Sequence, residues 1–173
     1  MVDIGLYYYS YEGFTDRVMR AVAEELGTSV ADAGGVYLER LIPMQEKRRT
    51  GLAKYMWGGR EALMGSRPDL RPLEREPADG AVIVIAGPVW AFTYPPPIGS
   101  FIARYDLSAH PVACILTNDG GPRKAPDKLA RALQPARVIG IAAMRNTGAD
   151  KPIVLDPIRP ILEAVIEEAG GRR

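Results

Sequence analysis

The sequence predicts one α/β domain, a five-stranded parallel sheet in the doubly wound order 2-1-3-4-5 between two layers of helices. Strand-length apolar runs alternate with segments of helical period along the whole chain. A length of 173 residues suits one compact core and is short for two. Right-handed crossovers leave few other strand orders. Residues 1–173 are therefore expected to form a single three-layer α/β/α sandwich.

The first predicted elements lie within residues 4–42. Residues 4–9 carry no charge, as a strand covered on both faces requires. The next segment has apolar residues at helical spacing, and Gly27 is expected to end this helix. Residues 36–42 mix apolar and charged side chains, which is typical of a strand nearer to the edge of the sheet.

A long insert, residues 43–79, follows the second strand. Residues 50–64 are predicted to form a helix broken at Gly58 and Gly59, and residues 67–77 a loop that prolines hold extended. The first part of the insert is basic, which usually marks a solvated face; its basic residues are Lys47, Arg48, Arg49, Lys54 and Arg60.

The alternation of strands and helices continues to the end of the chain. Residues 81–86 are uniformly apolar, and Gly87 and Pro88 are expected to end this strand. A helix is expected to begin within the three prolines at 95–97. Strands at 112–116 and 137–143 flank a helix at 126–133. Asp156 is expected to cap a last helix with an apolar face made of Ile158, Ile161, Leu162, Val165 and Ile166.

Composition excludes several classes of function. The 22 basic residues balance 21 acidic ones, and the formal net charge of +1 gives no sign of a nucleic-acid-binding protein. Cys114 lies in an apolar run and is expected in the core rather than as a nucleophile or metal ligand. His110 precedes a proline and is expected in a loop, without a catalytic role. No signal peptide or membrane span is apparent, so a cytoplasmic protein is expected.

Ligands of doubly wound sheets bind outside the carboxyl ends of the strands, where the winding reverses, and three unusual loops are expected there. The first loop joins a buried strand to a helix and consists of Ser10, Tyr11, Glu12, Gly13, Phe14 and Thr15. Unpaired amides at a helix start stabilise a phosphate, the two hydroxyls add donors, and the glycine lets a ligand approach the backbone. Alternatively, this loop is an ordinary turn capped by Thr15.

The second and third loops have different chemistry. The second contains Pro88, Val89, Trp90, Ala91, Phe92 and Thr93, with Tyr94 after them. Its aromatic side chains offer flat walls to a planar ring, or alternatively pack over the end of the sheet or against a second subunit in a homo-oligomer. In the third loop, paired glycines permit close approach to a ligand edge, although a plain loop also fits; it consists of Thr117, Asn118, Asp119, Gly120 and Gly121.

In order and spacing, the three loops resemble those of the flavodoxin family, and the resemblance covers nearly the whole chain. Residues 9–15 resemble that family's phosphate loop, a Thr-Gly-x-Thr type of turn. Residues 87–90 resemble its Gly-x-Pro-x-Trp type of segment, which flanks the isoalloxazine ring, and residues 117–121 its glycine-rich third loop. The resemblance implies FMN as the cofactor, bound by residues 10–15, residues 88–93, Thr117, Asn118, Gly120 and Gly121.

The first loop departs from the family pattern at two positions. Glu12 stands where a hydroxyl residue is usual, and Phe14 replaces a polar residue. A carboxylate beside a phosphate costs about 4 kcal/mol per charge pair at 4 Å with an effective dielectric near 20. Two arrangements avoid this cost: Glu12 points to solvent, or Arg17 one turn along neutralises it.

Three functions follow from these observations. The favoured one is an FMN oxidoreductase that passes electrons to a small acceptor such as a quinone; the cofactor supplies the chemistry and no side chain need act as acid or base. The second is an electron shuttle with a redox protein partner, which the balanced charge disfavours because shuttles usually dock through an acidic face. The third is a flavin-free relative that binds a partner through the aromatic loop.

Overall fold

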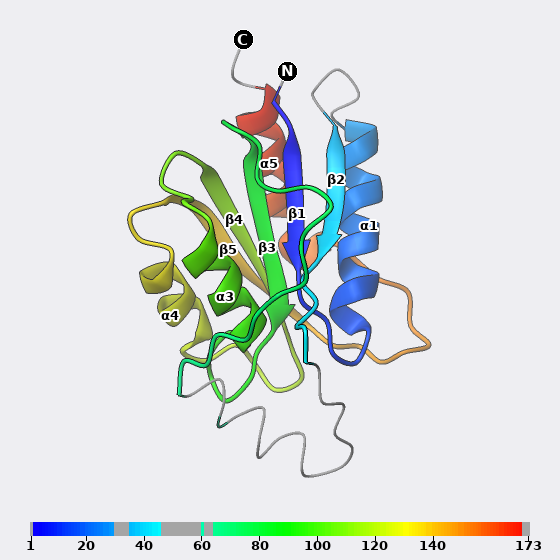
Figure 1. Cartoon of the computed structure of the whole chain (residues 1–173). Coiled ribbons are helices and arrows are strands. Elements are labelled where there is room, and N and C mark those ends of the chain that lie inside the picture. The colour runs from blue at the N-terminus through cyan, green and yellow to red at the C-terminus, as the bar shows by residue number, and fades with distance from the viewer. Residues whose placement is uncertain (1, 30–34, 46–59, 61–63, 171–173) are drawn as a thin grey trace.

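The computed structural model describes residues 2–29, 35–45, 60 and 64–170, and it confirms the predicted sheet. The strand order is β2-β1-β3-β4-β5 (Figure 1). All neighbouring strands are parallel, so their carboxyl ends share one edge, at the bottom of Figure 1. The strands are β1 (Ile4–Tyr8), β2 (Val36–Arg40), β3 (Val82–Pro88), β4 (Pro111–Asn118) and β5 (Arg137–Arg145).

Helices cover both faces of this sheet, because alternate residues of its central strands are apolar on both sides. Ile4, Leu6 and Tyr8 of β1 pack into a core with α1 (Phe14–Ser29) and α5 (Arg159–Gly170). Tyr7 and Tyr9 pack into the opposite core with α3 (Pro96–Arg104) and α4 (Ala125–Ala132). The predicted helix start within the three prolines is confirmed, since Pro96 opens α3.

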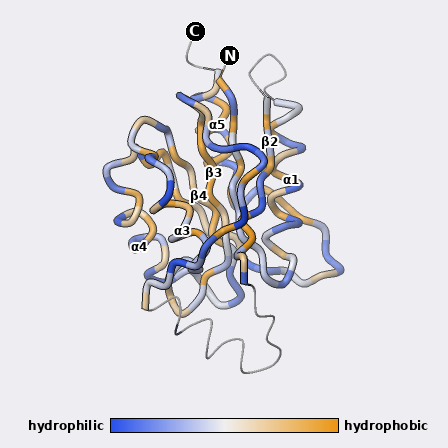
Figure 2. The backbone as a smooth tube through the Cα atoms, in the orientation of Figure 1, coloured by the Kyte–Doolittle hydropathy of each residue, from blue (hydrophilic) through white to orange (hydrophobic). Residues whose placement is uncertain are grey.

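An extended segment, residues 65–80, crosses the sheet on the α3 side and is mostly hydrophilic over hydrophobic strands (Figure 2). The Tyr7 hydroxyl donates to the Arg75 carbonyl at 3.2 Å, and the Glu39 carboxylate accepts the Arg75 N–H at 3.2 Å. Hydrogen bonds to Tyr7 and Glu39 therefore hold this segment, which the sequence predicted to be extended, against the sheet. The predicted helix at 50–64 lies outside the described residues except for Arg60 and Met64, as do Lys47, Arg48, Arg49 and Lys54.

Several predicted element ends were wrong. Gly27 does not end α1, which continues to Ser29, because its φ is not in the left-handed region that stops a helix. Gly87 and Pro88 belong to β3, and Pro88 pairs in register with Thr117 of β4. The strand β4 therefore includes Thr117 and Asn118, which were expected in the loop after it.

The last helix also begins differently from the prediction. Asp156 does not cap it but opens a 3-10 turn, η1 (Asp156–Ile158), in which the Asp156 carbonyl accepts the N–H of Arg159. The expected apolar face is buried, except for Ile166, which is only partly buried.

The single cysteine and the single histidine both serve the core. Cys114 is buried within β4, and burial raises the pKa of its thiol, so it stays protonated and unreactive. His110 lies in the turn before β4, with Nδ1 2.9 Å from the Ala81 carbonyl.

Within the described ranges, no helix combines the length and the apolar character that crossing a membrane requires.

Candidate functional site

The loops after β1, β3 and β4 meet at Thr117, close to the end of β4. The Oγ1 atoms of Thr117 and Thr15 lie 2.7 Å apart, and both residues are buried. The N–H of Val89 donates to the Thr117 carbonyl at 2.8 Å. The rings of Trp90 and Tyr11 meet edge to face at 5.7 Å. The three loops predicted from the sequence thus form one continuous structure.

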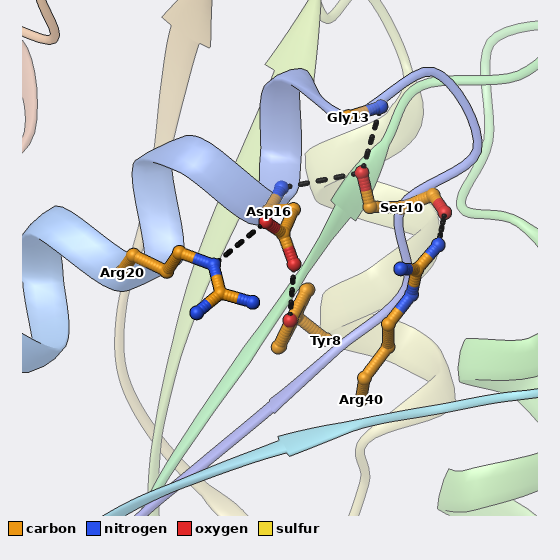
Figure 3. A network of polar contacts seen from close by, with 6 residues as sticks. All are labelled: Tyr8, Ser10, Gly13, Asp16, Arg20 and Arg40. Carbon is orange, nitrogen blue, oxygen red and sulfur yellow. Dashed lines mark hydrogen bonds and ion pairs between the residues drawn. The ribbon is translucent and has the colours of Figure 1, made fainter.

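Ser10 organises the first of these loops (Figure 3). Its Oγ accepts the N–H groups of Gly13 and Asp16, each at 3.2 Å, and the residue is only 1% exposed. The expected alternative, a turn capped by Thr15, was wrong. Ser10 caps the helix instead, and Thr15 turns its hydroxyl inward to Thr117.

The start of α1 directs backbone N–H groups out of this loop. The N–H of Arg17 goes to the Gly13 carbonyl at 3.1 Å. Those of Phe14 and Thr15 belong to the first turn, for which a helix supplies no acceptor of its own. Gly13 has a φ of +96°, and no heavy atom lies within 4 Å of where its Cβ would stand. A phosphate can therefore approach the backbone at the positive end of the helix.

The hydroxyls of Ser10 and Thr15, which were expected to donate to a ligand, already form hydrogen bonds within the protein. Each of these arrangements still leaves one hydroxyl proton available to a ligand. Ser10 Oγ accepts two N–H groups, and these bonds do not use its own proton. In the pair of Thr15 and Thr117, one proton lies between the two oxygens and the second can serve another acceptor.

A charged cluster lies at the base of the loop. Asp16 accepts bonds from the Tyr8 hydroxyl at 2.5 Å and from Arg20 Nε at 2.8 Å. Burial would raise the pKa of Asp16, but these bonds and the charges of Arg20 and Arg40 outweigh it and hold the pKa below its usual value. Burial and the bond to Asp16 raise the pKa of Tyr8 to about 12, so Tyr8 remains a donor at neutral pH.

Glu12 is an exposed residue of this loop. Arg17 is turned toward the linker after β5. It donates to the carbonyl of Gly148 at 3.0 Å and to that of Lys151. Arg17 therefore fastens this linker beside the start of α1.

The second loop turns back on itself at Ala91 and Phe92. Trp90 and Thr93 exchange two backbone hydrogen bonds, of 2.9 and 3.0 Å. The φ angles of Ala91 and Phe92 are +46° and +64°, so both central residues are left-handed. This is the pattern of a type I′ turn, which favours Asn-Gly. A left-handed side-chain-bearing residue costs about 1–2 kcal/mol, so the turn is strained.

The aromatic side chains of this loop have different environments. Trp90 lies between Tyr9 and Tyr11, with ring centres 5.6 and 5.7 Å away at near right angles. Phe92 is 50% exposed, and the guanidinium of Arg123 stands 4.9 Å from its ring centre. The Trp90 ring thus packs against both tyrosine rings, whereas the Phe92 ring is half exposed beside Arg123.

Sequence reasoning missed Arg123, which joins the second and third loops through Phe92. Arg123 itself has a φ of +46°. In the described part of the chain, the non-glycine residues with positive φ are therefore Ala91 and Phe92 of the second loop and Arg123, which closely follows the third. Strain of this kind is kept where the surroundings or the function require it. A basic residue directly after Gly121 and Pro122 was the available signal.

Asn118 shapes the third loop. Its Oδ1 accepts the N–H of Gly121 at 2.6 Å, and its carbonyl accepts the N–H of Asn146 at 2.7 Å. No heavy atom lies within 4 Å of the Cβ positions of Gly120 and Gly121. An open hollow of about 310 Å³ lies beside them, lined by Asn118, Gly120, Gly121, Pro122, Ala143 and Arg145. The expected close approach to the glycine backbone is sterically possible.

No protein-family model and no curated protein sequence matches this chain significantly. Solved structures do resemble it. A flavoprotein from Lactobacillus acidophilus in complex with FMN has a TM-score of 0.66 and 20% identity, covering 83% of this chain and 93% of its own. For a provisionally assigned flavoprotein from Bacteroides uniformis the values are 0.67, 20%, 85% and 92%.

A flavodoxin from Streptococcus pneumoniae is also similar, with a TM-score of 0.56 and 14% identity, covering 99% of this chain and 100% of its own. At these identities the likeness establishes the fold. The chain has the flavodoxin-like fold that the sequence predicted.

Proposed function

We propose that this chain binds FMN at the carboxyl edge of its flavodoxin-like sheet and acts as an oxidoreductase that passes electrons from the reduced flavin to a small acceptor such as a quinone. The observation that carries the proposal is the convergence of three loops on Thr117. One of them opens a helix, one is aromatic and one is rich in glycine. A nucleotide with a phosphate at one end and a planar ring at the other needs this combination.

The residue types on the three loops match the groups of FMN that they would bind. The phosphate would lie at the first turn of α1, where Gly13 leaves space for it. Ser10 and the pair of Thr15 and Thr117 each keep one hydroxyl proton that could be donated to it. The ring would lie between the segment 88–93 and the loop that includes Thr117, Asn118, Gly120 and Gly121. FMN would supply the electron-transfer chemistry, and the protein its binding, orientation and access. The structural neighbours, one of which is an FMN complex, support this assignment.

Glu12 provides a direct test of where the phosphate lies. Its carboxylate belongs to the loop that would hold a dianion, and its exposure lets solvent reduce the repulsion without removing it. Glu12→Thr is therefore expected to tighten FMN about tenfold, or about 1.4 kcal/mol, in a fluorescence titration. Glu24→Thr, an exposed site farther along α1, should leave the affinity unchanged. Equal FMN affinity in Glu12→Thr and the wild type would exclude a phosphate near this carboxylate.

A small acceptor is favoured over a protein partner by charge. Basic and acidic residues are balanced at 22 to 21, whereas an electron shuttle depends on a one-signed docking face. We expect reduction of a neutral quinone, with NADH as the reductant, to change less than twofold between low and high salt. NADH supplies two electrons and a proton, and a second proton from water completes the hydroquinone.

Trp90 connects this activity to the site, since its ring packs against the first loop. Trp90→Ala is expected to lower kcat/KM for the quinone roughly fivefold, because about 1 kcal/mol of aromatic contact is lost beyond burial. Tyr105→Ala removes an aromatic side chain at the end of α3 and serves as the control.

The alternative functions give different results in the same experiments. No quinone turnover, combined with rapid, salt-sensitive exchange with a reductase protein, would identify an electron shuttle. A colourless purified protein that also fails to bind added FMN would identify a flavin-free binding protein. The absorbance spectrum with and without FMN is therefore the first measurement to make.

A further inference from the structure

We propose that Arg40, at the end of strand β2, makes the first loop selective for a phosphate-bearing flavin, so that FMN is preferred over riboflavin. This inference rests on the proposed FMN site and adds to it a residue from outside the three loops. Arg40 was predicted only as part of an edge strand, and nothing in the loop motifs points to it.

The fold fixes where Arg40 stands. It is in register with Tyr8 of β1, and the next residue, Leu41, donates its N–H to the Tyr8 carbonyl at 2.7 Å. From there Nη2 of Arg40 donates to the Ser10 carbonyl at 2.8 Å (Figure 3). Ser10 is thus held on two sides, by Arg40 at its carbonyl and by the loop's own N–H groups at its Oγ.

This contact attaches a permanent positive charge to the loop that would hold the phosphate. An arginine stays protonated at all relevant pH values and presents five N–H donors. Among the described residues, the partner of Arg40 is the Ser10 carbonyl through one of these donors. The side chain is exposed, so the remaining donors can turn toward a phosphate oxygen.

The two arginines of α1 are already bonded to other groups. Arg20 is paired with Asp16, and Arg17 is bonded to the linker after β5. Glu12 adds a negative charge on the loop itself. The charge of Arg40 also reaches the start of α1: although burial would raise the pKa of Asp16, bonds from its neighbours together with the charges of Arg20 and Arg40 lower it. A phosphate at that helix start would experience the same field.

Flavin selectivity separates this role from a purely structural one. FMN and riboflavin carry the same ring, and they differ in the phosphate. Arg40→Gln keeps a side-chain donor for the Ser10 carbonyl but loses the charge, whereas Arg40→Lys keeps the charge. Fluorescence titration of both flavins is expected to show at least a tenfold loss of FMN affinity in Arg40→Gln, less than a twofold change for riboflavin, and FMN affinity within threefold of wild type in Arg40→Lys.

Arg137→Gln is the matched control, because it removes an arginine paired with Glu168 at the opposite edge of the sheet. It should change neither flavin affinity. Thermal unfolding of each variant checks that the fraction folded is the same.

The possible failures are distinguishable. Equal FMN affinity in Arg40→Gln and wild type, equal affinity of the wild type for FMN and riboflavin, or a parallel loss of both flavins in Arg40→Gln would each overturn the role of Arg40 while leaving the flavin site in place. A wild-type protein that binds neither flavin would overturn the proposed function, and the role of Arg40 with it.

Discussion

Replacing Gly13 with valine is expected to lower the affinity for FMN at least a hundredfold, a loss of about 2.7 kcal/mol. Gly13 has a φ of +96°, which a β-branched residue adopts only under strain. The space next to its Cα contains no protein atom within 4 Å of the Cβ position, so the protein tolerates the added volume there. A phosphate at the first turn of α1 would occupy this space, and the valine would exclude it.

Two variants separate exclusion of the ligand from backbone strain. Gly80→Val introduces the same side chain at another left-handed glycine, with a φ of +73°, before β3 at the amino edge of the sheet. It is expected to destabilise the fold without changing FMN affinity. Gly13→Ala should weaken FMN less than valine does, because alanine fills less space. If isothermal titration calorimetry on folded protein gives the same dissociation constant for Gly13→Val and wild type, the phosphate does not lie at this loop.

The fold was predictable because its determinants are local. Uniformly apolar runs such as 81–86 require a strand covered on both faces, and alternation of strands with helices requires right-handed crossovers. These two rules leave few strand orders, among them the doubly wound order β2-β1-β3-β4-β5 that the structure has. They also place three loops at one edge.

Element ends were less predictable because they depend on neighbours. Pro88 reads as a strand terminator, yet β3 continues because its partner Thr117 lies beside it in β4. Gly27 reads as a helix stop, but nothing at that position requires a left-handed residue. Thr15 was predicted to cap α1, but the Ser10 hydroxyl accepts the N–H of Asp16 and the Thr15 hydroxyl has a buried partner, Thr117, near the end of β4.

The candidate site was predictable as loops but not as a network. The motifs identify Ser10, Gly13 and Trp90 because residue type and chain position define them. Arg40 and Arg123 approach from other segments, and only the folded structure brings them to Ser10 and Phe92. Contacts over such sequence separation leave no periodicity or motif in the sequence.

The turn at Ala91 and Phe92 allows a test of whether the strain at this edge serves the site. Asn-Gly adopts left-handed conformations with little cost, so the double replacement Ala91→Asn with Phe92→Gly removes the strain from both positions. It also removes the contact between Phe92 and Arg123, which is worth about 0.5–1 kcal/mol at an exposed site. The free energy of unfolding is expected to rise by about 2 kcal/mol in chemical denaturation.

Flavin binding is expected to move in the opposite direction, with FMN affinity falling severalfold in the same double variant. Residues that cost stability are kept where their side chains serve function, and a gain in stability combined with a loss of binding is the signature of that compromise. Val154→Gly serves as the control, because it removes another exposed apolar side chain where φ is not left-handed and should only destabilise. Unchanged FMN affinity in the stabilised protein would mean that Phe92 stands outside the flavin site. Reduced stability would instead mean that the contact with Arg123, together with the backbone freedom that the new glycine adds to the unfolded chain, outweighs the strain of the turn.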